Sequence, residues 1–316
     1  MSYFVTATVR STPAPEPRPA PDSREFWLES WDGLQVLPIG GYRHEGALQL
    51  QTGNLGLEEA PTDVFTEAQP QTAGAVVVDV QTPARPILLP LLVNTRDQAA
   101  QMLEVQALRD LTDPTTGMTR DGNFRLVCRS ASGTRQVGLV RRSGMEGTGG
   151  LLPWVAGYVL DCEAPQPFAE DRTDQTRPFR LIADTAPFLG GVWGEIYLSS
   201  SRIASSATPV EMLSAVPVWP VIEITGPADS VLITSGNGLR IDVPAGVPGG
   251  STLRIVTDPR HKSIRLDGAP AAGMLARGST LAPFALGTTL VDVSAPGATA
   301  DTLLRLTWRG LHRSMW

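Results

Sequence analysis

The side chains that most often carry chemistry are few in this chain and widely spaced. The three histidines, His44, His261 and His312, have no cysteine or carboxylate near them at metal-ligand spacing. A metal site would therefore require residues distant in sequence to converge on one point. The sequence also lacks a G-x-S-x-G elbow, an H-E-x-x-H pair and a phosphate-binding loop. We predict no catalytic, cofactor-binding or metal-binding residues, no cofactor and no enzymatic activity.

The two cysteines, Cys128 and Cys162, lie in apolar segments of the kind that form strands. Two cysteines cannot build a disulfide framework. We interpret them as buried thiols in preference to a bridge.

Carboxylates beside aromatic residues raise the alternative of sugar chemistry. Trp193, Glu195 and Tyr197 alternate along one segment, which places them on the same face of a strand. Glycosidases need two acids facing one sugar, and a polar face with aromatic packing is the more common reason for such a pattern. Tryptophans can also stack on sugar rings, but core or interface packing is the default for those in apolar runs. The other tryptophans considered are Trp154, Trp219, Trp308 and Trp316.

The composition is that of a globular protein with a buried core. The chain has 316 residues, 42% hydrophobic and 18% charged, which is enough for two domains. A net charge of −6 argues against nucleic-acid binding as the main role. The N-terminus does not have the pattern of a signal peptide, and no apolar run approaches the roughly 18 residues of a membrane span. We expect a soluble protein made in a reducing compartment, without membrane insertion.

The first half mixes strands with one helix. Residues 11–21, STPAPEPRPAP, form a proline-rich arm that cannot join a central strand. Ordered structure is expected to resume at 24–39, with a turn at Asp32-Gly33. Alternating or continuous apolar runs then predict strands; these lie within 46–53, 74–93, 123–129, 134–142 and 154–165.

The helix is predicted within 88–117, directly behind an apolar strand. Asn94 or Thr95 can cap it, and Asp113-Pro114 with Gly117 ends it. One apolar stripe runs along it, made of Ala100, Leu103, Ala107 and Leu111 with Leu108 beside them.

A helix with a single stripe covers one sheet face and cannot seed a bundle. We therefore expect Leu103 and Leu111 to be buried and Glu104 and Arg109 to lie near solvent. The alternative is that the stripe is a subunit contact, exposed in the monomer.

The second half is almost wholly β. A charged, proline-containing stretch at 163–179 suggests a domain boundary near residue 170. Short alternating strands without a helix then predict a two-sheet sandwich or jelly roll. The eight candidate strands lie within 193–201, 218–227, 230–235, 238–244, 251–257, 263–268, 288–296 and 302–310.

The order of these weak motifs resembles that of the distal tail proteins of long-tailed bacteriophages, also called phage minor tail proteins. The resemblance is to the form carried by phages of GC-rich actinobacteria and covers about residues 30–316. The motifs that carry it are RPILLPLLV with the helix behind it, LTDPTTG, FRLVCRSASGTRQVGLVRRSG, VLDCEAPQPF, SAVPVWPVIEITGP, STLRIVTDP, IRLDG and TLLRLTWRG.

The resemblance implies a mainly β protein: residues 1–170 as a ring-forming β domain with one helix and the proline-rich arm, and residues 171–316 as a galectin-like β-sandwich. It implies a homo-oligomeric ring, a hexamer, that joins the distal end of the tail tube to the tail tip or baseplate. Partners would be other copies of the chain, the tail tube protein and the tail tip or hub protein, with DNA only in transit through the lumen. The location would be the distal end of the virion tail, after assembly in the host cytoplasm. A carbohydrate-binding host-adhesion module is the alternative, and a secreted hydrolase comes third.

Overall fold

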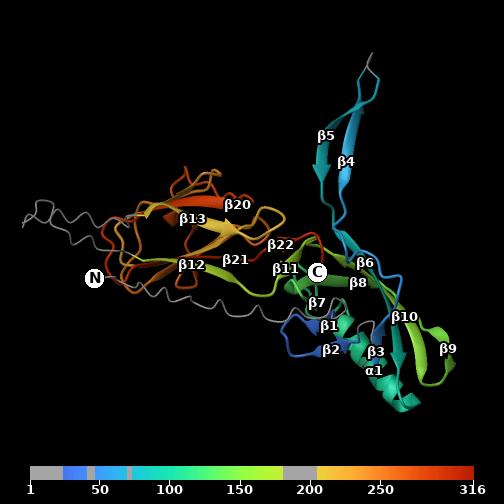
Figure 1. Cartoon of the computed structure of the whole chain (residues 1–316). Coiled ribbons are helices and arrows are strands. Elements are labelled where there is room, and N and C mark those ends of the chain that lie inside the picture. Colours follow the sequence, from blue (N-terminus) through green and yellow to red (C-terminus); the bar gives the residue numbers. More distant parts are fainter. Residues whose placement is uncertain (1–23, 41–46, 70–72, 181–204) are drawn as a thin grey trace, which may run out of the picture.

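The computed structural model describes residues 24–40, 47–69, 73–180 and 205–316. The described chain is mainly β with a single α-helix, as predicted (Figure 1). The proline-rich arm, His44 and the Trp193, Glu195 and Tyr197 segment lie outside the described residues. No helix among the described residues is long and apolar enough to cross a membrane.

The first unit is built on a ten-stranded sheet. Its main path runs β2-β1-β7-β8-β10-β6-β3, all antiparallel, with β9, β11 and β22 joined to it at the sides. The path strands are β1 (Glu25–Ser30), β2 (Val36–Ile39), β3 (Leu48–Leu50), β6 (Arg85–Asn94), β7 (Phe124–Ser130), β8 (Gly133–Ser143) and β10 (Val155–Ala164). The side strands are β9 (Thr148–Leu152), β11 (Ala169–Asp171) and β22 (Leu311–His312).

Alternation along β6 explains how this sheet acquires its core. Ile87, Leu89, Leu91 and Val93 point to one side and are buried, while the residues between them are more exposed. Leu126 on β7 and Leu160 on β10 join the same cluster. The predicted strands of the first half are therefore confirmed.

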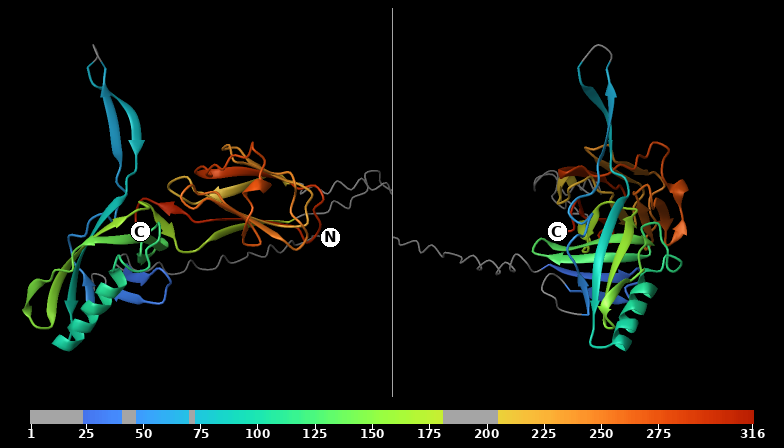
Figure 2. Two further views of the ribbon diagram at one scale, coloured as in Figure 1. Left: turned by 180° about the vertical axis from the view of Figure 1, so that it is seen from behind. Right: turned by 90° about the vertical axis from the view of Figure 1, so that its right-hand side faces the viewer.

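The single helix, α1 (Gln98–Thr112), lies against this sheet near β1 and β6 (Figure 2). Its end after Thr112 agrees with the prediction, and Pro114 follows at once. The predicted cap was wrong. Asp97 caps the helix, its carboxylate accepting from the Ala100 N–H at 2.8 Å. Asn94 is still the last residue of β6, and the Thr95 N–H is bonded to the carbonyl of Trp154 at 3.1 Å.

The predicted apolar stripe was right at Leu108 and Leu111, which are buried, and wrong at Leu103 and Ala107, which are exposed. The buried positions are Val105, Leu108, Leu111 and Thr112, whereas Leu103 is 73% exposed. Leu103 lies two residues before Val105, a rotation of about 200° around the helix axis, so it points away from the sheet. Ala107 is exposed as well, Arg109 is exposed as expected, and Glu104 is half-buried.

The second unit is a sandwich of two antiparallel sheets. The six-stranded sheet runs β12-β21-β14-β17-β18-β19 and the four-stranded sheet runs β13-β20-β15-β16. The strands are β12 (Gln175–Arg180), β13 (Ser205–Met212), β14 (Val221–Thr225), β15 (Val231–Ser235), β16 (Arg240–Val243), β17 (Thr252–Val256), β18 (Ser263–Leu266), β19 (Ala269–Pro270), β20 (Gly287–Ser294) and β21 (Leu303–Trp308). Seven of the eight predicted strands are present, and the run at 193–201 lies outside the described residues.

The stretch predicted as a boundary contains a strand of the sandwich. β12 pairs with β21 along its whole length, and Phe179 is buried in the sandwich core. The charged residues and the proline of β12 made this segment resemble a linker in the sequence. Pro178 is tolerated in the strand because β12 lies at the edge of its sheet, where no partner needs its N–H. The division of the chain at residue 170 stays a prediction.

The end of the chain returns to the first unit. β22 pairs with β11, which in turn pairs with β8. Met315 is fully buried in the first core, and Trp316 packs against it.

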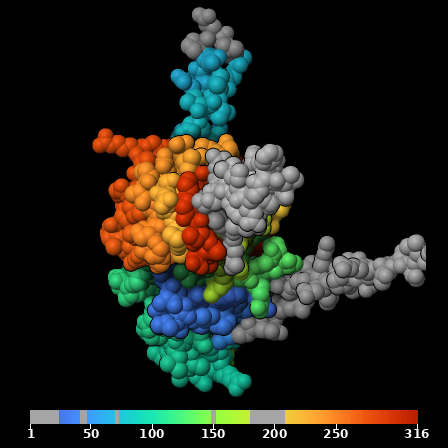
Figure 3. Space-filling view, turned by 90° about the vertical axis from the view of Figure 1, so that its left-hand side faces the viewer, coloured from blue at the N-terminus to red at the C-terminus, as the bar shows by residue number. Residues whose placement is uncertain are grey.

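A long hairpin stands away from the body. It consists of β4 (Asp63–Ala68) and β5 (Ala75–Gln81), which form a two-stranded sheet of their own. The space-filling view shows it projecting clear of both units (Figure 3). The sequence had indicated β5 but not its partner.

We expect the two leucines of α1 to respond differently to truncation. Leu108→Ala should lower the free energy of unfolding by about 2–5 kcal/mol, because Leu108 is fully buried. Leu103→Ala should change it by no more than about 0.5 kcal/mol, as surface substitutions do. Denaturant melts of both variants test this, and equal losses would contradict the observed phase of the helix.

Candidate functional site

The two described histidines, His261 and His312, contact different carboxylates. His261 Nε2 lies 2.8 Å from Asp121 Oδ2, and His312 Nε2 lies 2.8 Å from Asp171 Oδ1. Among the described residues no group of three or more His, Cys, Asp or Glu side chains is placed to hold a metal ion. Each described histidine instead makes a polar contact with a single carboxylate.

Both cysteines are free and buried, which confirms their interpretation as buried thiols. Burial raises the pKa of the Cys128 thiol to about 11 and that of Cys162 to about 12. At neutral pH both stay protonated, so neither is poised as a nucleophile.

The tryptophans have different roles. Trp308 is buried in the sandwich core, and its Nε1 donates to Gln175 at 3.1 Å. Trp316 meets Phe26 edge-on with ring centroids 6.2 Å apart, and the Arg24 guanidinium lies over its ring at 4.1 Å. Trp154 is 39% exposed. Core packing, the default expectation, therefore holds for Trp308, whereas Trp219 is half-buried and lines a groove.

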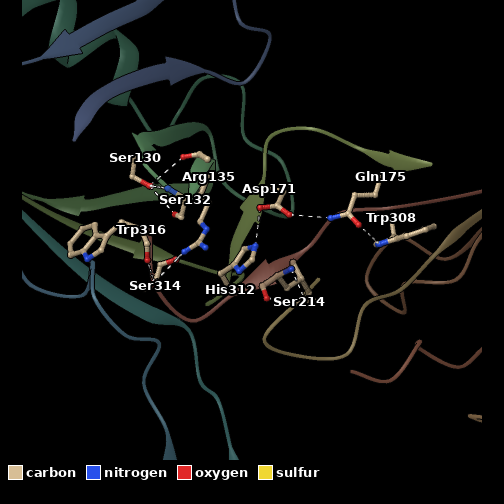
Figure 4. A network of polar contacts seen from close by, with 12 residues as sticks. Ser130, Ser132, Arg135, Asp171, Gln175, Ser214, Trp308, His312, Ser314 and Trp316 are labelled. Carbon is tan, nitrogen blue, oxygen red and sulfur yellow. Dashed lines mark hydrogen bonds and ion pairs between the residues drawn. The ribbon is translucent and has the colours of Figure 1, made fainter. Parts of the chain in front are cut away.

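A chain of polar contacts links the first sheet to the sandwich (Figure 4). His312 of β22 contacts Asp171 of β11; the Gln175 side-chain amide donates to Asp171 at 3.5 Å and accepts from Trp308. Next to it, the Ser214 hydroxyl donates to the carbonyl of Leu311 at 3.0 Å. These contacts join β22, β11, β12 and β21 where the chain passes between the two units.

A second link starts from Glu29, which is nearly buried on β1. Its carboxylate accepts two hydrogen bonds from Arg172, at 2.7 and 3.1 Å, and lies 3.8 Å from Arg125. Trp27 Nε1 donates to it at 3.3 Å. The Arg172 guanidinium holds the pKa of the Glu29 carboxyl below its usual range, with smaller contributions from Trp27 and Arg125. The pair ties β1 to the segment between β11 and β12.

A third polar cluster lies within the first unit, around the side chain of Arg85, which is fully buried at the start of β6. Its Nε donates to the carbonyl of Gly56, and its Nη1 donates to the carbonyls of Pro167 at 3.1 Å and Arg313 at 2.9 Å. Burial lowers the pKa of the guanidinium to about 10. The charge is therefore retained at neutral pH and bonded to three separate segments.

A groove of about 820 Å³ lies beside these links. Its floor is the outer face of the six-stranded sheet, where Glu223 lies 3.5 Å from both Arg254 and Arg305. Its rim includes Asp121 from the first unit, 3.3 Å from Arg260. Trp219 and Trp308 are the tryptophans of the lining, and Trp219 is the more exposed of the two. The arrangement offers paired charges and an aromatic surface, which suits a polar ligand better than an apolar one.

The charges in this groove were not anticipated from the sequence. Arg254 and Arg305 read as the polar residues of alternating strands, and only strand pairing brings both to Glu223. The sequence contains only a weak indication that Arg85 is buried, namely its position as a charged residue at the start of an apolar run.

We expect Glu29→Gln to destabilise the fold by about 1–3 kcal/mol at neutral pH, because Arg172 and Arg125 lose the nearly buried carboxylate that accepts from them. The pKa of Glu29 is lower in the folded than in the unfolded chain, so its contribution is present above about pH 4.5 and is lost as pH falls through the folded pKa. The difference between variant and natural chain should therefore shrink in acid. Denaturant midpoints across this pH range measure it.

Glu25→Gln is the matched control on the same strand. Glu25 pairs with Arg129, but both side chains are more than half exposed, so the change should be within about 1 kcal/mol. Equal effects of the two substitutions, or a Glu29→Gln effect that grows in acid, would contradict the assignment.

Comparison with known proteins shows the fold. No protein-family model matches the sequence, and no curated protein matches it. Among solved structures, the Dit protein of SPP1, described as a paradigm of the hub adsorption apparatus in phages that infect Gram-positive hosts, is similar over 90% of this chain and 98% of its own, with 13% identity and a TM-score of 0.61. A chain of the phage P2 baseplate in its activated conformation with Ca is similar over 91% of this chain and 98% of its own, with 11% identity and a TM-score of 0.51. The chain thus has the fold of a phage Dit protein along nearly its whole length.

Proposed function

We propose that this protein is a structural subunit of a bacteriophage tail, a distal tail protein that forms a hexameric ring. The ring joins the distal end of the tail tube to the tail tip or baseplate, and DNA passes through its lumen. The observation that carries the proposal is the fold shared with the SPP1 Dit protein over 90% of this chain, which takes in both units. A likeness to only one unit would be weaker support, because β-sandwiches host many functions.

The two units have separate roles in this proposal. Residues 1–170 form the ring, and residues 171–316 form a galectin-like sandwich that faces outward. Two distinct cores support the division, one centred on the ten-stranded sheet and one within the sandwich. The final residues belong to the first core although they come last in the sequence.

A ring subunit must present two different surfaces to its neighbours. The hairpin of β4 and β5 forms a two-stranded sheet of its own, so each of its strands has one edge without a strand partner within the described chain. Such edges can pair with another copy. The net charge of −6 agrees with a lumen through which DNA slides without being held.

The partners follow from the position at the tail end: other copies of the chain, the tail tube protein and the tail tip or hub protein, in a virion assembled in the host cytoplasm. A non-enzymatic role is part of this proposal, and the likeness to the SPP1 Dit protein and to a chain of the phage P2 baseplate supports it. The actinobacterial host type stays a prediction from the sequence.

We expect the purified chain to assemble into particles of about six times 33.7 kDa. Size-exclusion chromatography with light scattering measures the mass, and negative-stain electron microscopy shows whether the particles are rings. Tail tube protein, added in a parallel sample, should promote assembly. A chain that stays monomeric at high concentration, with or without tube protein, would contradict the proposal.

A carbohydrate-binding role is the second candidate, favoured by the groove with Trp219, Glu223 and two arginines. Sugars bind where an aromatic face meets fixed polar groups. Titration calorimetry with glucose and galactose oligosaccharides tests this role. Binding that Trp219→Ala abolishes and Trp154→Ala leaves intact would support it, whereas no heat with any sugar would count against it.

A further inference from the structure

Besides the paired strands β11 and β22, a cluster of charged side chains joins the sandwich to the first unit. Arg260 Nη1 lies 3.3 Å from Asp121 Oδ1, and His261 Nε2 lies 2.8 Å from Asp121 Oδ2. The Arg120 guanidinium donates to the carbonyl of Arg260. Each contact joins the loop between β17 and β18 to the loop before β7, so all of them cross from the sandwich to the first unit. The groove borders both this cluster and the strand pair.

The first unit holds its side of the contact in a fixed position. The Thr119 N–H donates to the carbonyl of Gly122 at 2.9 Å, and the Thr119 hydroxyl donates to the same carbonyl at 2.6 Å. The loop then packs directly on β8, where a Cβ at Gly138 would lie 2.1 Å from the carbonyl oxygen of Asp121. The Asp121 carboxylate is therefore carried on a short turn that rests against the sheet.

The sandwich arranges its side of the contact independently of the first unit. The Asp258 carboxylate accepts from the Arg260 N–H at 2.9 Å and from Arg260 Nη2 at 2.8 Å. The His261 N–H donates to the Asp258 carbonyl at 3.0 Å. Before them, the Thr257 hydroxyl is buried and donates to the carbonyl of Pro220 at 2.6 Å. The loop therefore presents the arginine and the histidine side by side through hydrogen bonds within the sandwich.

The contact has polar groups but no apolar core. None of the residues 119–122 or 258–261 belongs to either hydrophobic cluster. The side chain of Asp121 is 23% exposed, and those of Arg260 and His261 are each 37% exposed. Ion pairs that solvent reaches are weak, and salt screens them. The strand pair on the other side is stronger, because β11 and β22 share backbone hydrogen bonds and continue into the first sheet.

We propose that Asp121, Arg260 and His261 form an ionic latch, and that the sandwich turns about the paired strands β11 and β22 when this latch opens. The structure is the closed state. The Glu29–Arg172 pair can persist during the turn, because Arg172 follows β11 at once. Opening widens the groove, which the latch and the strand pair both border. The inference does not depend on ring assembly, since every residue of the latch belongs to one chain.

Single-molecule fluorescence energy transfer between the two units measures the opening. Leu34→Cys places one dye on the first unit, where Leu34 is 84% exposed, and Leu290→Cys places the other on the sandwich, where Leu290 is 52% exposed. Both natural cysteines are buried, so the dyes are confined to the new positions. The labelled full-length chain is mixed with an excess of unlabelled chain, so that each signal comes from within one chain.

We expect the natural chain to show mainly one closed population in low salt and a second, open population in about 1 M salt. Asp121→Asn should raise the ratio of open to closed chains at least about threefold in low salt, because both contacts of the carboxylate lose their charge. Asp242→Asn is the matched control. Asp242 pairs with Arg240 at 3.5 Å within the sandwich alone, so this variant should behave as the natural chain does.

A second variant distinguishes opening of the latch from loss of structure. Arg260→Gln should also favour the open population, and adding it to Asp121→Asn should have little further effect, since the two residues act through one contact. Circular dichroism and unfolding midpoints of all variants should stay close to those of the natural chain, because neither hydrophobic cluster contains these residues.

Three results would overturn the latch. The first is a natural chain that is mainly open in low salt. The second is a single closed population that neither high salt nor Asp121→Asn changes, which would mean that the strand pair alone fixes the sandwich. The third is an equal response to Asp242→Asn, which would trace the effect to the overall charge. The ring proposal is tested separately, by the measurements of assembly.

Discussion

The buried guanidinium of Arg85 holds together the three segments of the first unit that surround the attachment of the sandwich. A cation taken out of water is costly unless polar groups replace its hydration shell. Here three backbone carbonyls accept from Nε and Nη1, while Nη2 is buried without a hydrogen-bond partner among the described residues. The carbonyls come from the loop before the hairpin of β4 and β5, from the end of the first half, and from the last residues of the chain. Displacing any one of the three segments leaves a buried charge short of a partner. The pKa of the guanidinium, lowered to about 10 by burial, shows that this environment already opposes the charge.

The hydrogen bonds to Arg85 also explain why a glycine occupies position 56. Gly56 has a φ of +76°, and a Cβ there would lie 2.0 Å from the carbonyl oxygen of Pro86. The residue that offers its carbonyl to Arg85 must therefore lack a side chain. The glycine lets the loop approach β6 closely, and this close approach brings the Gly56 carbonyl to the buried Arg85 side chain.

The C-terminal segment held by Arg85 determines how the sandwich is attached. The chain enters the sandwich after β11 and leaves it before β22, and these two strands pair with each other. The sandwich is thus held by two strands side by side, reinforced by the Glu29–Arg172 ion pair and the Asp171–Gln175–Trp308 contacts. In the proposed ring, such a double attachment keeps one unit in the ring and the other facing outward. The groove beside it is a consequence of the same geometry.

The sequence by itself determined the class of the fold and most of its strands, because alternation of apolar residues is a local property that each strand carries in its own residues. The alternating row of Ile87, Leu89, Leu91 and Val93 can be recognised in the sequence without knowing which strands β6 pairs with. The end of α1 before Pro114 can be recognised in the same way. Only the tertiary structure decided the features that depend on which other segment an element packs against or pairs with. Leu103 has the spacing of a core residue, yet the sheet receives Val105 and Leu108, since the face that a helix presents is chosen by the surface it docks on. β12 is hidden by its charges and proline, and only pairing with β21 makes it a strand. Arg85 and its three carbonyls are separated by up to 228 positions in sequence, and no local pattern can signal a contact between residues so far apart.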